Sequence, residues 1–111
     1  MLGETIRNLA QLSVLALSAN QITSLLPLKK LLETHTGLRH LWLHDNQITS
    51  LSGLETATGL TYLSLSRNQI TDISGLAKLT RLTYLSIYNN PINKTDINAL
   101  RMKLPNVDIR V

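Results

Sequence analysis

The chain has 111 residues, of which 43% are hydrophobic and 16% are charged, with a formal net charge of +4. This length suits one domain or one short repeat array, and the hydrophobic content excludes disorder. Leucine fills 24 positions while cysteine does not occur, which excludes disulfides, zinc–thiolate sites and cysteine nucleophiles. The longest charge-free run, 8–28, is too polar for a transmembrane helix, so we expect no membrane insertion.

Two short segments bear on the compartment without settling it. Residues 9–19 (LAQLSVLALSA), behind Arg7, have the composition of a secretory signal cleaved after Ala19. Each of them also fits the repeat described next, so a cytoplasmic location is favoured over secretion. Asn93-Lys94-Thr95 is a glycosylation sequon. Thr95 suits equally well the N-cap of a short helix with Asp96 in its first turn, so the sequon identifies no compartment.

One frame of apolar positions recurs along the chain. It opens at Leu12, Leu38, Leu60, Leu82 and Leu104. Three residues later it has Leu15, Leu41, Leu63, Leu85 and Val107, and two further on Leu17, Leu43, Leu65, Ile87 and Ile109. The first four copies continue with asparagine at Asn20, Asn46, Asn68 and Asn90, and then with isoleucine at Ile22, Ile48, Ile70 and Ile92. A fixed period of about 22 residues indicates a repeat solenoid.

The spacing within each copy predicts its local structure. Alternation of apolar residues, as in Leu15-x-Leu17, predicts a short strand with one buried face. We expect the following asparagines to turn the chain and to form a hydrogen-bonded ladder, because an amide both donates and accepts. The first step carries four extra residues, in which Pro27–Glu33 predicts an amphipathic helix. The last copy predicts a helix over 95–103 and a fifth strand over 106–111.

The frame L-x-x-L-x-L-x-x-N-x-I-x-x-L/I-x-x-L resembles the leucine-rich repeat, specifically the 22-residue subclass typified by bacterial internalins. The resemblance covers Leu9 to Val111. It implies an α/β, right-handed leucine-rich repeat solenoid, with about five short parallel strands on the concave face and helices or turns on the convex face. We expect a single domain, 1–111. It divides into a partial N-terminal coil (1–11, with Ile6 and Leu9), four repeats (12–92), and a capping helix with the last strand (93–111).

The outward positions of the five strands form three columns. They are, in strand order, Val14, His40, Tyr62, Tyr84 and Asn106; Ala16, Trp42, Ser64, Ser86 and Asp108; and Ser18, His44, Ser66, Tyr88 and Arg110. All four aromatic residues of the chain fall in these columns, and exposed aromatics are enriched at binding hot spots. We therefore expect a non-enzymatic protein–protein interaction module that needs no cofactor and binds another protein on this face. The expected contacts are His40, Trp42, His44, Tyr62, Tyr84, Tyr88, Asp108 and Arg110.

Three alternatives stay open. Trp and Tyr platforms also stack on sugar rings, which would make the face a carbohydrate-binding surface. The array would otherwise be a purely structural scaffold, a fragment of a larger protein whose concave side chains contact nothing. Self-association through the N-terminal coil or the aromatic face is the third.

Other chemistries fit the sequence poorly. His40 and His44 lie about 13 Å apart if they share an extended strand, too far to bind one metal ion. His44-Asp45 beside Ser66 has the residue types of a hydrolase, but the chain lacks a nucleophile elbow and an oxyanion-hole motif. Most basic residues are expected on the convex side, at Lys29, Lys30, Lys78, Arg81, Arg101 and Lys103. That distribution does not form a phosphate-tracking stripe, and nucleic acid is not expected as a partner.

Overall fold

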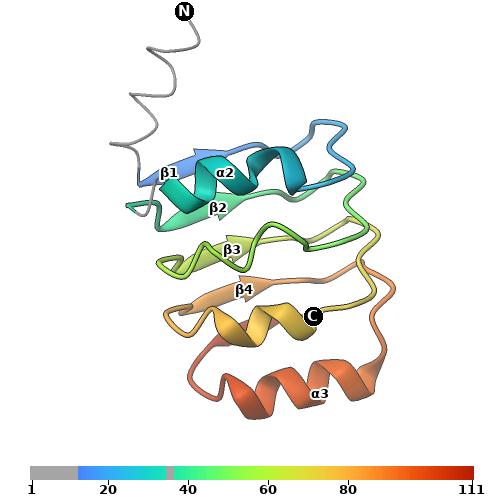
Figure 1. Ribbon diagram of the computed structural model, residues 1–111. Helices are drawn as coiled ribbons and strands as arrows, with labels where there is room; N and C mark the ends of the chain where they lie inside the picture. The colour runs from blue at the N-terminus through green and yellow to red at the C-terminus, as the bar shows by residue number, and fades with distance from the viewer. Residues whose placement is uncertain (1–12, 35–36) are drawn as a thin grey trace, which may run out of the picture.

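The computed structural model describes residues 13–34 and 37–111 of the chain. Within them five strands alternate with helical or irregular segments (Figure 1). The strands are β1 (Val14–Ala16), β2 (His40–Trp42), β3 (Tyr62–Ser64), β4 (Tyr84–Ser86) and β5 (Asp108–Arg110). The helices are α2 (Leu26–Thr34), the 3₁₀ helix η1 (Ser74–Lys78) and α3 (Lys94–Lys103). None of the helices in these two stretches has the length and apolar character needed to cross a membrane.

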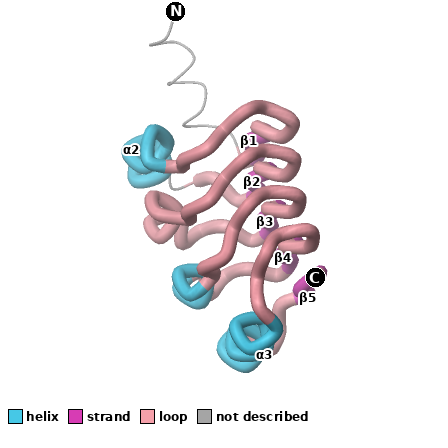
Figure 2. Tube along the Cα trace, turned by 90° about the vertical axis from the view of Figure 1, so that its right-hand side faces the viewer, coloured by secondary structure: helices cyan, strands magenta, loops and turns pink. Residues whose placement is uncertain are grey.

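The strands form one parallel sheet in chain order, β1-β2-β3-β4-β5. Each coil of the chain therefore lies against the next, as Figure 2 shows, with the strands along one side and the helical segments along the other. Leu15, Leu41, Leu63 and Leu85 are paired across the sheet in the order that the repeat predicts. The predicted leucine-rich repeat solenoid with five parallel strands is confirmed.

The register of the fifth strand differs from the prediction. Ile109, and not Val107, pairs with Leu85, so the last step is 24 residues long. Asp108 consequently lies beside Tyr84 and Arg110 beside Ser86, while Asn106 falls outside the strand. The ten-residue helix α3 accounts for the difference, since the preceding coil has only the five-residue η1 in its place. A helix advances only about 1.5 Å per residue and uses more residues to cross the same distance.

The two α-helices on the convex side lie within one residue of their predicted positions, and the N-cap of α3 differs from the prediction. Helix α2 has Pro27 as its second residue, as expected from the fixed φ of proline. Helix α3 begins one residue earlier than predicted, and its N-cap is Asn93 instead of Thr95: the Asn93 side chain accepts a hydrogen bond of 2.9 Å from the Asp96 amide. Both residue types cap helices well, so the sequence alone does not choose between them.

The interior is a single aliphatic layer that runs the length of the sheet. Leucine and isoleucine side chains from consecutive coils, such as Leu41, Leu63, Leu65 and Leu85, are fully buried in it. Gly53 lies close to the backbone of the coil before it: its φ is +105°, and a Cβ atom there would lie 2.9 Å from the carbonyl oxygen of Leu25. Only glycine tolerates both conditions without strain.

The ladder asparagines hold successive coils together through the backbone. The Nδ2 of Asn46 and that of Asn68 both donate to the Leu43 carbonyl, each at 3.0 Å. The Leu65 carbonyl accepts in the same way from Asn68 and Asn90, and the Leu17 carbonyl from Asn20 and Asn46. Each Oδ1 beyond the first coil accepts from an isoleucine amide of the coil before, as Asn68 does from Ile48 at 3.0 Å. Each shared carbonyl thus joins two neighbouring asparagines.

The residue before each ladder asparagine has a left-handed backbone conformation. These residues are Ala19, Asp45, Arg67 and Asn89, with φ between 55° and 60°. Asn and Asp tolerate this region, whereas for Ala it costs about 1 kcal/mol or more. The turn that follows each of the first four strands therefore imposes the same backbone conformation on four different side chains.

Candidate functional site

Side chains of four neighbouring coils meet on the outer face of the sheet. His40 and Trp42 belong to β2, Tyr62 to β3 and Tyr84 to β4, and all four are half-buried. His44 and Tyr88 stand two residues beyond the ends of β2 and β4 and are also half-buried, whereas Asp108 and Arg110 on β5 are exposed. All eight residues expected as contacts therefore lie on, or directly beside, the sheet.

Three of the rings form a continuous stack across the strands. Tyr62 and Tyr84 have ring centroids 4.4 Å apart and planes within 10° of parallel. Trp42 stacks on the opposite side of Tyr62, at 5.3 Å and 22°. His40 and His44 flank the stack with tilted rings, 5.5 Å from Tyr62 and 5.9 Å from Trp42. We call Trp42, Tyr62 and Tyr84 the aromatic row.

The geometry of the row decides which parts of the rings are available. Two rings with centroids 4.4 Å apart cannot lie side by side in one plane, so their faces are directed at each other along the strand-to-strand direction. Tyr62 lies on the middle of the three strands, and both of its faces are covered, by Trp42 and by Tyr84. A molecule approaching the sheet therefore meets ring edges. Ring edges carry partial positive charge, whereas faces carry partial negative charge.

Two polar groups of the row, the Tyr62 phenol and the Trp42 indole N–H, are partly or fully removed from water. Burial raises the pKa of the Tyr62 phenol above its usual value, and the neighbouring Tyr84 adds to the effect. The Nε1 of Trp42 is covered by its surroundings and has no acceptor in the part of the chain that the structure describes. A covered donor without an acceptor costs about 1–3 kcal/mol. In this position the indole ring stacks on Tyr62, but its N–H forms no hydrogen bond with the described residues.

Beside the row, four serine hydroxyls form hydrogen bonds with the His44 ring or with each other. The Nδ1 of His44 lies 3.0 Å from the Ser18 hydroxyl and 2.9 Å from the Ser64 hydroxyl. The hydroxyls of Ser66 and Ser86 bond each other. Ser64, Ser66 and Ser86 are all buried. This network was not foreseen in the sequence, since it depends on which hydroxyl each side-chain rotamer brings to the histidine.

The residue types of a hydrolase are present, but they are not assembled. Asp45 is bound to Arg67 instead of orienting His44, and Ser66 is bonded to Ser86. His44 reaches Ser18 and Ser64 instead. His40 and His44 contact different rings, and residues 13–34 and 37–111 hold no group of three or more potential metal ligands.

Two ion pairs lie at the margins of the surface. The Arg67 guanidinium binds the Asp45 carboxylate through two bonds, of 2.5 Å and 3.1 Å, and lies 5.6 Å from the centre of the Tyr88 ring. The hydrogen bond from Arg67 holds the pKa of Asp45 below its usual value and raises the pKa of Arg67 itself. On β5, Arg110 binds Asp108 at 2.9 Å. Each acid on this face is therefore paired with a base of the same face.

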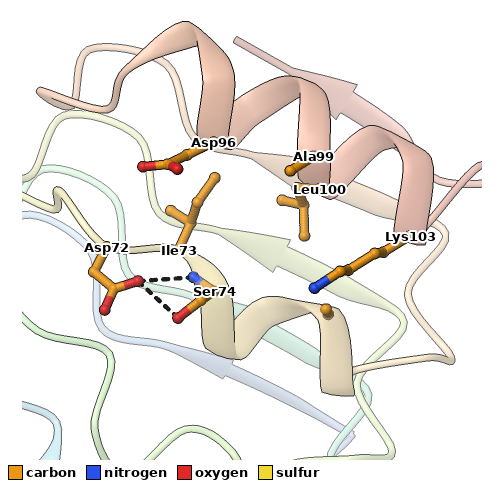
Figure 3. Close-up of a pocket in the computed structure, with 8 residues that line it drawn as sticks. Asp72, Ile73, Ser74, Asp96, Ala99, Leu100 and Lys103 are labelled. Atoms are coloured by element: carbon orange, nitrogen blue, oxygen red, sulfur yellow. Dashed lines mark hydrogen bonds between the residues drawn. The ribbon is translucent and has the colours of Figure 1, made fainter.

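The convex side contains a groove of about 220 Å³ between η1 and α3 (Figure 3). Its apolar wall includes Ile73 and Leu100, and Asp96 and Lys103 lie towards its two ends. Asp72 at its rim accepts bonds from the amide and the hydroxyl of Ser74, which lowers the pKa of that carboxyl. The Asp72 carboxylate is thus bonded to the first residue of η1, and the groove is a seam between two packed segments.

These features define a solenoid repeat protein. Its coils stack in parallel around a buried aliphatic layer and are joined by an asparagine ladder, and the side chains on the exposed face of the sheet differ from strand to strand. The family described as Leucine Rich repeats (2 copies) matches residues 36–68 and 58–102. The chain belongs to the leucine-rich repeat family, whose members are in general protein-interaction modules and typically not enzymes.

Solved structures place it near bacterial internalins. Internalin C2 of Listeria monocytogenes is 35% identical, with a TM-score of 0.74 over 94% of this chain and 43% of that one. An internalin (inlF) of the same organism is 30% identical, with a TM-score of 0.70 over 95% of this chain and 36% of the other. A chain of the Drosophila melanogaster SNF/U2A′ complex is 26% identical, with a TM-score of 0.71 over 96% and 62%. This chain thus spans less than half of the two internalins. No curated protein sequence matches it significantly.

Proposed function

We propose that the chain is a recognition module that binds a protein partner through the aromatic row, with His40, His44 and Tyr88 around it and Asp108 and Arg110 at the C-terminal margin. The stack itself is the observation that carries this proposal. Three large rings lie half-buried across β2, β3 and β4, and none of them is needed to fill the aliphatic layer on the other side of the sheet. Aromatic residues in contact with one another are the residues that dominate protein interfaces.

The edge-on arrangement favours a protein over a sugar. Stacking of a sugar ring requires an open aromatic face, and Tyr62 has none. Only the outer faces of Trp42 and Tyr84 remain at the two ends of the row. A protein segment, by contrast, contacts ring edges through its carbonyl groups and aliphatic side chains. One of the similar chains comes from a complex, the SNF/U2A′ complex of Drosophila melanogaster.

The size of the face limits the interface. Five strands about 4.8 Å apart span roughly 19 Å, which is narrow for the approximately 800 Å² that each partner buries in a standard interface. We therefore propose a contact of modest affinity on these strands alone.

The proposal is tested by affinity capture from a lysate with mass spectrometry. The baits are the wild-type chain, a Trp42→Ser/Tyr62→Ser/Tyr84→Ser variant, and a convex control, Lys29→Ser/Lys30→Ser/Glu33→Ser, whose three residues are exposed on α2. Circular dichroism establishes that all three are folded. We expect a protein retained by wild type and by the convex control but lost by the concave variant. Identical captured proteins for all three baits would refute the proposal and would favour a glycan ligand, self-association or a structural role.

A further inference from the structure

The charges of the concave face are balanced within the face itself. Asp45 is paired with Arg67 and Asp108 with Arg110, so the two pairs together contribute no net charge. The excess positive charge of the chain, +4 with neutral histidines, therefore resides elsewhere, and its convex share includes Lys29 and Lys30 of α2 and Lys78 of η1. A partner with a strong charge of either sign finds no complementary field on this face.

The polar groups at the base of the face are also engaged with one another. The hydroxyls of Ser18 and Ser64 bond the His44 ring, and those of Ser66 and Ser86 bond each other. Ser64, Ser66 and Ser86 are also buried, so the polar side chains of a partner could reach their hydroxyls only by displacing the side chains around them. The base is therefore suited to a segment that demands few side-chain hydrogen bonds.

What the face offers freely is a line of ring edges. Successive centroids are 5.3 and 4.4 Å apart, so the row is as long as about three residues of an extended chain at roughly 3.3 Å per residue. The positive edges suit carbonyl oxygens, and the hydrocarbon around them suits aliphatic side chains. In addition, the Trp42 indole N–H is buried and lacks an acceptor among the described residues.

We infer that the partner contributes an uncharged, extended peptide segment whose carbonyl groups and aliphatic side chains lie across the edges of Trp42, Tyr62 and Tyr84. This inference rests on the proposed function and adds the chemistry of the bound segment. Its main consequence is that binding is insensitive to ionic strength, because no charge of the partner is attracted or desolvated at the row.

The probe that tests it is a displayed library of random 16-residue peptides. Peptides are selected on the wild-type chain and counter-selected on Trp42→Ser/Tyr62→Ser/Tyr84→Ser. The enriched peptides are then labelled with a fluorophore, and their affinities for the wild-type chain and for the variant are measured by fluorescence anisotropy at 50 and at 500 mM NaCl. The label is on the peptide because the variant lacks Trp42, the one tryptophan of the chain.

We expect peptides that bind wild type at least tenfold more tightly than the variant, that share aliphatic but no charged positions, and whose affinity changes less than twofold between the two salt concentrations. Enriched peptides that require acidic or basic residues, and that lose tenfold or more in high salt, would overturn the inference while leaving a protein-binding concave face intact. A selection that yields no peptide able to distinguish wild type from the variant would refute the proposed function, and this inference with it.

Discussion

Replacement of Asn68 by leucine removes one rung of the ladder in the middle of the array. The Ile48 amide then loses its acceptor, and a stranded buried N–H costs about 1–3 kcal/mol. The carbonyls of Leu43 and Leu65 each lose one of two asparagine donors, at about 0.5–1.5 kcal/mol per bond. We therefore expect Asn68→Leu to lower the free energy of unfolding by roughly 2–6 kcal/mol, a large part of the stability of a domain this size.

The measurement is equilibrium unfolding in urea, followed by Trp42 fluorescence and circular dichroism. Two variants that are expected to lose less stability serve as controls. Gln69→Leu changes an exposed neighbour whose backbone amide, not its side chain, bonds the preceding coil, and it is expected to stay within about 0.5 kcal/mol of wild type. Asn20→Leu changes an exposed rung whose side chain, among the described residues, donates to two carbonyls of its own coil, and a loss of about 1 kcal/mol is expected. Equal losses for Asn68→Leu and Gln69→Leu would refute the assignment of Asn68 as a structural bridge between coils.

Two further predictions follow from the turns and the margin of the face. Ala19→Gly is expected to stabilise the chain by about 0.5–1 kcal/mol in urea unfolding, because Ala19 has a φ of 58° that glycine adopts without strain; a loss of stability would contradict that origin. Asp45 has a lowered pKa, chiefly through its bond from Arg67, so its contribution to stability is present above its ordinary pKa of 3.8 and is lost as the pH falls through the folded-state value. Arg67→Gln should move the Asp45 carboxyl titration, followed by carbon NMR, upwards toward that ordinary value, and an unchanged titration would show that another group sets it.

The repeat made most of the fold predictable. A frame that recurs every 22 residues with the same asparagine fixes strand positions, the buried face and the neighbours of Leu41, Leu63 and Leu85. The fifth strand was misplaced by two residues because Val107 and Ile109 are spaced like Leu15 and Leu17, and the sequence does not show how many residues α3 takes up.

The sequence predicted which site residues share a column of the sheet, but not all of the contacts between their side chains. Tyr62 over Tyr84 follows directly from the period, since equivalent positions of adjacent strands are neighbours. The stacking of Trp42 on Tyr62 is a diagonal contact between two columns, and the bonds from His44 to Ser18 and Ser64 cross three strands. Both depend on side-chain rotamers that the packing of neighbouring coils selects, and no linear spacing encodes them.

The claim that the aromatic row is the contact surface is tested most directly by photo-crosslinking in cells that express the chain. p-Benzoylphenylalanine is introduced as Tyr84→p-benzoylphenylalanine on the row or as Lys30→p-benzoylphenylalanine on the exposed side of α2. We expect a discrete crosslinked protein from position 84 and none from position 30. A crosslink that forms from position 30 and not from position 84 would place the partner on the convex side and contradict the account.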